Sequence, residues 1–153
     1  MLLNVLVMDR MSDTFSKNCN FEFKKGSTTA IVGRSGLGKT TLVKLILGIT
    51  SLNEGDILVC GSSILDMKNL SKVRRRNIGC VFQNFNLISG FTVKENILLP
   101  RYFFENGENN INEICNTLGL SKEMLSKSID KISGGEKQRV ALARALINNP
   151  RKY

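Results

Sequence analysis

The segment Gly33–Thr40 constrains the fold of this chain more than any other feature. It spells Gly-Arg-Ser-Gly-Leu-Gly-Lys-Thr and fits the pattern G-x-x-x-x-G-K-[ST]. The β-branched run Thr28–Val32 precedes it directly and predicts a buried strand. Apolar residues at helical spacing follow over Thr40–Gly48, which predicts a helix that Gly48 closes. A glycine-rich loop between a strand and a helix indicates an α/β domain that binds phosphate.

The chemistry of this loop depends on its residue types. Glycines allow positive φ angles, so that successive backbone N–H groups face an anion, and the helix start adds a positive dipole end. Lys39 is expected against the β- and γ-phosphates of a nucleotide, and the Thr40 hydroxyl on Mg²⁺. On this segment alone, a glycine-rich turn without a ligand stays open. The candidate nucleotide-binding residues are Gly33, Arg34, Ser35, Gly36, Leu37, Gly38, Lys39, Thr40 and Thr41.

Strands and helices are expected to alternate along the rest of the chain, which indicates an α/β domain with a largely parallel core sheet. Residues from about 92 to 130 carry no strand signal and predict a helical insert, broken at Pro100 and Gly107. A last helix is expected from Ser133 to about Ile147. The further strands are expected at residues 2–8, 19–23, 56–60 and 78–82.

Composition narrows the chemistry. The chain has 153 residues, enough for one domain, and no apolar run reaches the roughly 18 residues of a membrane-spanning helix. It contains no His, which excludes Ser-His-Asp triads and His-ligated metals. Its four Cys residues are widely spaced, so we expect reduced thiols rather than disulfides or zinc. The net charge of +9 favours a polyanion, without choosing among nucleic acid, lipid and nucleotide.

Two further motifs indicate a family. Ile132–Arg139 spells Ile-Ser-Gly-Gly-Glu-Lys-Gln-Arg and resembles the signature motif of ATP-binding cassette (ABC) ATPases, which Val140–Pro150 continues. Val81–Asn84 resembles the Q-loop of that family, with Gln83 as its glutamine. The three motifs stand in the family's order, and the resemblance extends from about residue 15 onward. It implies the P-loop NTPase core of an ABC ATPase, with an antiparallel β subdomain and a helical insert.

The resemblance also implies roles and partners. Gln83 would contact Mg²⁺ and the attacking water, and the cofactors would be ATP and Mg²⁺. Ser133 is expected to cap the last helix, and Ser133, Gly134, Gly135 and Glu136 would face the ATP of a second cassette packed head to tail. Transmembrane permease subunits would be the other partners, placing the protein in the cytoplasm at the inner face of the membrane. One partial ABC domain is expected, with a nucleotide-binding core over about 1–91, a helical subdomain over about 92–132 and the signature helix over 133–147.

The chain departs from the family in two places. The Asp-Glu pair and the switch His that follow the signature helix in the family do not occur in these 153 residues. We therefore expect an incomplete core sheet, no hydrolysis by this chain alone, and a partial cassette: a gene fragment, a frameshifted product or a piece of a longer protein. Arg10 stands where the family stacks an aromatic residue on adenine; a solvated surface Arg is at least as good an interpretation.

The function expected from the resemblance is an energy-coupling ATPase subunit of an exporter. The wording of the motifs resembles a bacterial subgroup that serves lipoprotein, macrolide, bacteriocin or antimicrobial-peptide export. A non-enzymatic remnant, and a separate cassette ATPase acting on ribosomes or DNA, are the alternatives. The basic run over 68–76 has no interleaved aromatic residue, so no nucleic-acid partner is expected.

Overall fold

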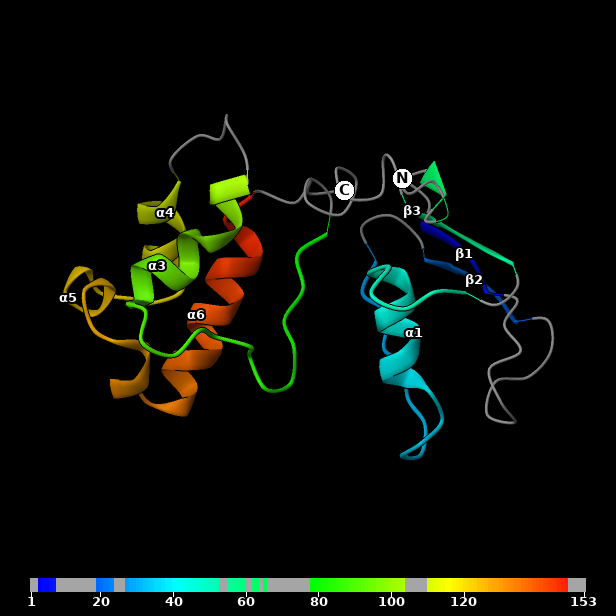
Figure 1. Cartoon of the computed structure of the whole chain (residues 1–153), viewed down its shortest axis with the longest axis horizontal. Coiled ribbons are helices and arrows are strands. Elements are labelled where there is room, and N and C mark those ends of the chain that lie inside the picture. Colours follow the sequence, from blue (N-terminus) through cyan, green and yellow to red (C-terminus); the bar gives the residue numbers. More distant parts are fainter. Residues whose placement is uncertain are drawn as a thin grey trace. The chain divides into compact units, whose positions relative to one another are not determined.

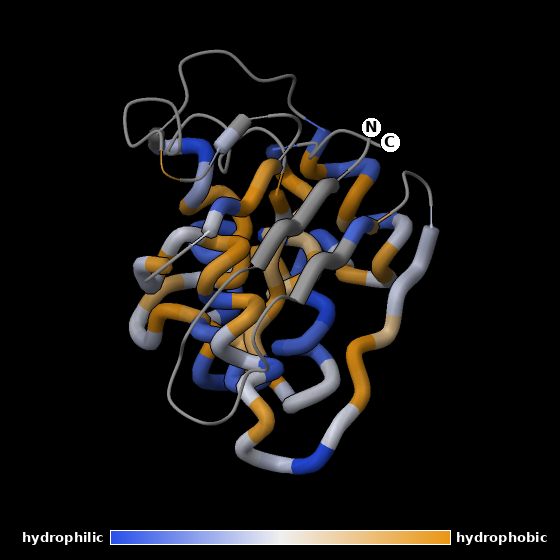
Figure 2. The backbone as a smooth tube through the Cα atoms, turned by 90° about the vertical axis from the view of Figure 1, so that its right-hand side faces the viewer, coloured by the Kyte–Doolittle hydropathy of each residue, from blue (hydrophilic) through white to orange (hydrophobic). Residues whose placement is uncertain are grey.

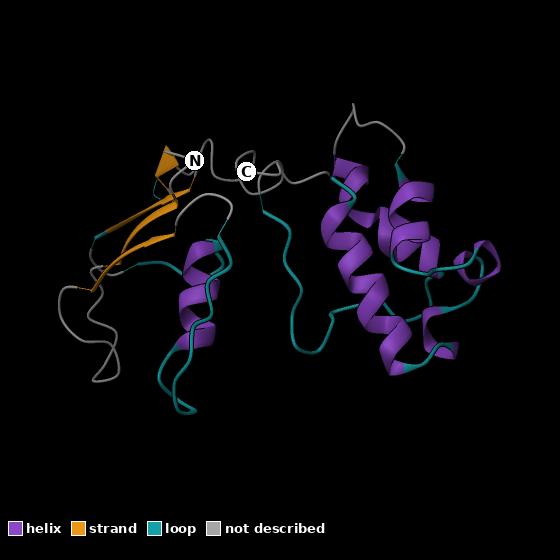
Figure 3. Ribbon diagram, turned by 180° about the vertical axis from the view of Figure 1, so that it is seen from behind, coloured by secondary structure: helices purple, strands orange, loops and turns teal. Residues whose placement is uncertain are grey.

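The computed structural model describes residues 3–7, 19–23, 27–52, 55–59, 62–63, 65, 78–103 and 110–148. These residues belong to two compact units, one within Met1–Arg74 and one within Arg75–Arg151 (Figure 1). The named strands lie in the first unit, and every described helix except α1 lies in the second (Figure 3).

The first unit contains a four-stranded sheet in the order β2-β1-β3-β4, and every strand pair in it is antiparallel. Val5 on β1 pairs with Phe21 on one side and with Ile57 on the other. Ile57 is fully buried. The strands predicted at 2–8, 19–23 and 56–60 are confirmed to within a residue or two. The bounds are β1 Leu3–Val7, β2 Cys19–Phe23, β3 Asp56–Val59 and β4 Ser62–Ser63.

Helix α1 (Lys39–Ile46) packs against β3 through an apolar face. Leu42 and Leu45 are buried on that face, as their helical spacing predicts. The helix ends where predicted, because Gly48 has a φ of 57° and breaks the helical path. This helix fixes the end of the glycine-rich loop against the sheet.

Two predicted core strands are not strands in the structure. Thr28–Val32 and Ile78–Phe82 both lack strand pairing, and no parallel strand pair occurs in the part of the chain that the structure describes. The reason is that a strand needs a neighbour to bond its backbone groups, and neither run has one among those residues. Val32 is 89% exposed and Val81 is 41% exposed, so neither is the buried core residue that the apolar pattern predicts. The apolar end of the first run appears in orange just before the loop in Figure 2.

From Val93 onward, the described residues of the second unit form mostly helices, as predicted for the insert and the last helix. The predicted break at Pro100 is confirmed, because the α-helical turns give way to a 3-10 helix at Leu99, while Gly107 lies outside the described residues. The predicted last helix is also confirmed. The helices are α3 Val93–Leu98, η1 Leu99–Phe103, α4 Ile111–Thr117, α5 Lys122–Leu125, η2 Ile129–Lys131 and α6 Gly134–Leu146.

The core of the second unit is built between α3 and α6. Val93 and Ile97 of α3 and Val140 of α6 are all fully buried. Residues of α4, α5 and η2 complete this cluster. Because α6 begins with the signature motif, the core holds that motif in place.

Candidate functional site

The glycine-rich loop Gly33–Thr40, called here the phosphate loop, has the backbone that an anion site needs. Gly36 and Gly38 have φ angles of 84° and 75°, a region that favours glycine. Gly38 is the N-cap residue of α1, and no side chain caps the helix start. Its first-turn N–H groups are therefore available to a ligand, and they lie at the positive end of the helix dipole.

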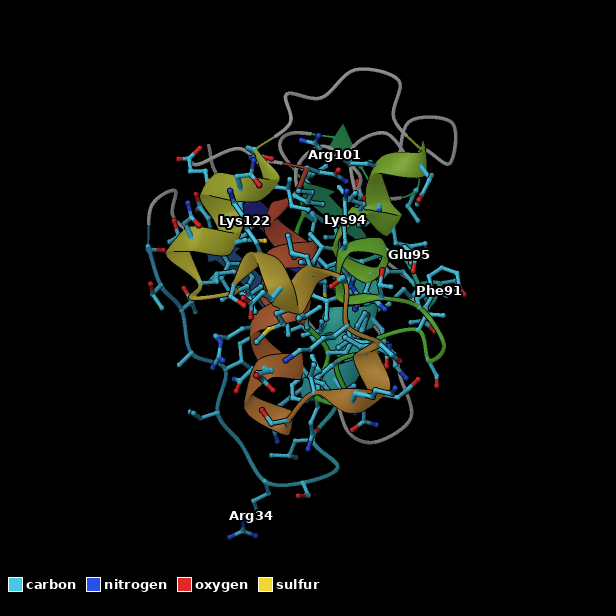
Figure 4. All side chains as sticks on the ribbon, turned by 90° about the vertical axis from the view of Figure 1, so that its left-hand side faces the viewer. Arg34, Phe91, Lys94, Glu95, Arg101 and Lys122 are labelled. Atoms are coloured by element: carbon cyan, nitrogen blue, oxygen red, sulfur yellow. The ribbon has the colours of Figure 1, made fainter. Side chains whose placement is uncertain are left out.

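Lys39 lies inside the phosphate loop. Its Nζ atom donates hydrogen bonds to the carbonyl oxygens of Gly33, at 2.6 Å, and Arg34, at 2.7 Å. The ammonium group is thus held by the loop's own backbone, next to the bare helix start. Arg34 projects from the tip of the loop in Figure 4 and is exposed. Ser35, Leu37 and Thr40 are exposed as well, and Thr41 is half-buried.

This donor set fits a nucleotide phosphate with its metal ion. Free N–H groups and an ammonium group bind phosphate oxygens. The Thr40 hydroxyl is exposed in the first turn of α1, and a hydroxyl oxygen is a ligand type that Mg²⁺ accepts. The described residues contain no group of three or more Cys, His, Asp or Glu that could hold a metal by protein ligands alone. Mg²⁺ in such a site takes its remaining ligands from phosphate and water.

Gln83 lies exposed in a tight turn of the second unit. The Phe85 N–H donates to the Phe82 carbonyl at 2.9 Å, which closes the turn around Gln83. The next two residues are unusual, because Phe85 and Asn86 have φ angles of 59° and 46° without being glycine. We call Phe82–Asn86 the Gln83 turn.

Side chains from three helices hold the segment that contains and follows Gln83. Arg144 of α6 donates from Nη1 to the Asn86 carbonyl at 2.6 Å and from Nη2 to the Phe85 carbonyl at 2.5 Å. Fully buried Asn96 of α3 accepts from the Ile88 N–H at 2.7 Å and donates to the Ile88 carbonyl at 3.1 Å. Asp130 of η2 accepts from the Gly90 N–H at 2.9 Å and from the Ser89 hydroxyl at 2.8 Å. The last two bonds lower the pKa of Asp130, the Gly90 bond most.

The signature motif forms the capped start of α6. The Ser133 Oγ atom accepts from the Glu136 N–H at 3.3 Å, and a Glu136 carboxylate oxygen accepts from the Ser133 N–H and hydroxyl at 2.7 Å each. This capping box confirms the predicted cap. The bonds from Ser133 hold the pKa of Glu136 below its ordinary value, and the nearby charges of Arg139 and Lys127 lower it further.

Because Gly134 and Gly135 have no side chains, the backbone at the start of the signature helix α6 is accessible to solvent. Both are exposed, and a Cβ atom on Gly134 would meet nothing within 4 Å. A ligand can therefore approach the backbone at the first turn of α6 closely. The arrangement resembles the start of α1, except that here a side chain caps the helix.

The structure distributes the predicted residues over both units. The phosphate loop lies in the first unit, whereas Gln83 and the signature motif lie together in the second. Arg144 joins the last two, because it extends from the signature helix to the Gln83 turn. Arg10 and the basic run over 68–76 lie outside the described residues.

Comparison with known proteins identifies the family. The sequence pattern described as "ABC transporter" matches residues 16–153. The chain belongs to the ABC transporter family. It is 42% identical over 139 residues to the spermidine/putrescine import ATP-binding protein PotA of Thermotoga maritima, covering 88% of this chain and 36% of that protein. It is 40% identical over 140 residues to the lipoprotein-releasing system ATP-binding protein LolD of Bacteroides fragilis, covering 88% and 64%.

Solved structures agree with this family and with the predicted fold. The dimeric structure of MJ0796, a bacterial ABC transporter cassette, matches with a TM-score of 0.81 and 34% identity, covering 98% of this chain and 71% of that one. A post-hydrolysis dimer of the same cassette, bound to ADP and phosphate, matches with a TM-score of 0.80 and 32% identity. The chain thus spans between about a third and just under two thirds of the length of the two curated relatives compared here.

The residues predicted from the sequence patterns do not include Asn96, Asp130 or Arg144, which hold the segment that contains and follows Gln83. Asn96 has a recognisable signal, because it is a polar residue between Val93 and Ile97 on an apolar helix face. Asp130 and Arg144 have none: each stands in a sequence where a solvated charge is the ordinary interpretation. Their roles follow from tertiary contacts.

Proposed function

We propose that this chain binds ATP–Mg²⁺ at the phosphate loop and serves as the nucleotide-binding part of a membrane transporter. The observation that carries the proposal is the position of Lys39, whose ammonium lies among the loop carbonyls beside the uncapped start of α1. An arriving triphosphate would exchange those carbonyls for phosphate oxygens, a stronger charge-assisted interaction. Thr40 would hold Mg²⁺, and the ion would offset the negative charge of the phosphate groups.

The remaining predicted residues have roles in the same proposal. Gln83 would orient a water and contact Mg²⁺ from its exposed turn. The open N–H groups at Gly134 and Gly135, with Ser133 and Glu136 fixing the backbone, would face the γ-phosphate of an ATP bound by a second cassette. The match to a cassette solved as a dimer supports a second cassette as the partner. Arg10 would stack on adenine.

The test is nucleotide titration with a matched control. Lys39→Ala should reduce the affinity of the chain for ATP–Mg²⁺ by at least about tenfold, as expected for the loss of a charge-assisted phosphate contact. Lys44→Ala removes an exposed lysine from the last turn of the same helix and should leave the affinity within about twofold. Equal affinities for the wild type and Lys39→Ala would reject the phosphate loop as the site.

For the direction of transport, we propose export. The resemblance of the motifs to exporter-type cassettes and the likeness to a lipoprotein-releasing ATP-binding protein support it. PotA, named for import, is equally similar, and this makes import the competing outcome. We propose permease subunits as membrane partners and a place at the inner membrane face; no helix among the described residues is long and apolar enough to cross a bilayer. Co-purification with a tagged permease, followed by cargo flux in vesicles of known orientation, would decide the direction.

A further inference from the structure

The Gln83 turn contains two consecutive residues in a conformation that L-amino acids rarely adopt. Phe85 and Asn86 both lie in the left-handed region, at φ 59° and 46°. Each such residue is strained because its Cβ atom crowds the backbone, and the cost is greater for the bulky Phe85 than for Asn86. Interactions elsewhere must therefore select this conformation.

Arg144 supplies the interaction. Its Nη1 and Nη2 atoms donate to the carbonyl oxygens of Asn86, at 2.6 Å, and Phe85, at 2.5 Å. The planar guanidinium fork thus binds the carbonyls of the two strained residues at once. Figure 1 shows this green segment running beside the red and orange α6, which carries Arg144.

The environment strengthens this contact. Arg144 is half-buried, and burial lowers the pKa of its guanidinium group. A desolvated cation needs hydrogen-bond acceptors, and among the described residues the Arg144 guanidinium donates to these two carbonyls. Any other conformation of the turn would move the carbonyls and leave the guanidinium without them.

The hydrogen bonds from Arg144 constrain Gln83 through the backbone of the Gln83 turn. The Phe85 N–H closes the turn on the Phe82 carbonyl, so the residue that Arg144 holds also ends the turn that presents Gln83. We infer that Arg144 is a positioning residue that fixes the orientation of Gln83 by selecting the left-handed pair Phe85–Asn86. The expected effect of Arg144 on nucleotide affinity rests on the proposed function, in which Gln83 contacts Mg²⁺ and water.

The decisive variant keeps the charge and removes the fork. Arg144→Lys retains a cation and an aliphatic stem, but a single ammonium cannot reproduce two parallel N–H bonds. Arg101→Lys is the matched control. Arg101 is also half-buried, and its hydrogen bonds to described residues go to the Ile147 carbonyl just beyond α6 and to the Asn110 side chain rather than to the Gln83 turn.

The first measurement is site-resolved amide hydrogen exchange on the full chain. In Arg144→Lys, the Phe85 and Asn86 amides should exchange at least about tenfold faster, as the loss of a contact that offsets local strain predicts. Amides inside α3 should keep their rates. Arg101→Lys should leave the Phe85 and Asn86 amides unchanged. Unchanged rates at these two amides in Arg144→Lys, or a uniform increase across the second unit, would overturn the inference.

The second measurement is equilibrium titration with a fluorescent ATP analogue, with and without Mg²⁺. Arg144→Lys should lose most of the affinity that Mg²⁺ adds and keep its affinity without Mg²⁺, a split that general destabilisation does not produce. A variant that retains the full Mg²⁺ enhancement would overturn the coupling to Gln83. A wild-type chain that binds no nucleotide would instead reject the proposed function, and the exchange measurement alone would then decide the role of Arg144.

Discussion

Replacing Asn96 with leucine tests how the segment after Gln83 is held. The Asn96 side chain is fully buried and makes three hydrogen bonds, accepting from the Ile88 N–H and donating to the carbonyls of Ile88 and Thr92. Leucine has the same branching and number of heavy atoms as asparagine but offers no partner to any of these groups. The Thr92 carbonyl keeps a bond from the Asn96 N–H at 3.0 Å, so the loss falls on Ile88.

The magnitude follows from the two polar groups that lose their partner. A buried donor or acceptor left unsatisfied costs about 1–3 kcal/mol. Ile88 is 37% exposed, so water replaces part of each bond, and we take about 1–1.5 kcal/mol for each group. After some gain from the added apolar surface, Asn96→Leu should destabilise the second unit by about 2 kcal/mol, roughly 30-fold in its unfolding equilibrium.

Urea unfolding followed by far-ultraviolet circular dichroism measures this change, because the second unit contains most of the helix. Asn112→Leu is the control: Asn112 is exposed on α4, and a surface change of this kind alters stability by less than about 0.5 kcal/mol. Equal unfolding midpoints for the two variants would show that the Asn96 bonds do not hold the segment, and the reasoning from buried polar groups would fail here.

Three further predictions concern packing, acid stability and the apolar surface. Gly79→Ala should destabilise the second unit by about 1–3 kcal/mol, because the added Cβ would lie 2.5 Å from the Ala145 carbonyl oxygen on the backbone of α6. Thermal unfolding measures this change. The control is Gly134→Ala, which should leave the stability unchanged because nothing lies within 4 Å of the added Cβ. Hydrogen bonds lower the pKa values of Glu95, Asp130 and Glu136. These carboxylates therefore stabilise the second unit at any pH above their ordinary pKa values near about 4. This stabilisation should disappear as the pH falls through the lowered pKa values. Acid titration should therefore show a shallower loss in Glu136→Gln than in the exposed control Glu113→Gln, and identical curves would contradict it. Val32 is 89% and Ile31 42% exposed, so the chain should bind a hydrophobic dye before it melts. A sharp thermal transition near about 60 °C without earlier dye binding would contradict the exposure of this apolar surface.

The phosphate loop, the signature motif and most helices could be predicted from the sequence because their causes are local. Glycine at positions 36 and 38 permits the positive φ angles of the loop, and Ser133 with Glu136 caps the start of α6. The helical spacing of Leu42 and Leu45 determines the buried face of α1. The strands at residues 3–7 and 19–23 were also predictable, the first from a short apolar run and the second from the alternation of apolar and polar residues.

Tertiary structure decided what depends on partners distant in sequence. Thr28–Val32 and Ile78–Phe82 have the composition of core strands, but a run of β-branched residues becomes a strand only beside another strand, and these two have none among the described residues. Arg144 acts 58 residues away from Asn86, and Asp130 acts 40 residues away from Gly90. A hydrogen bond across such a separation leaves no periodicity in the sequence, because it depends on where the packed helices bring the two groups.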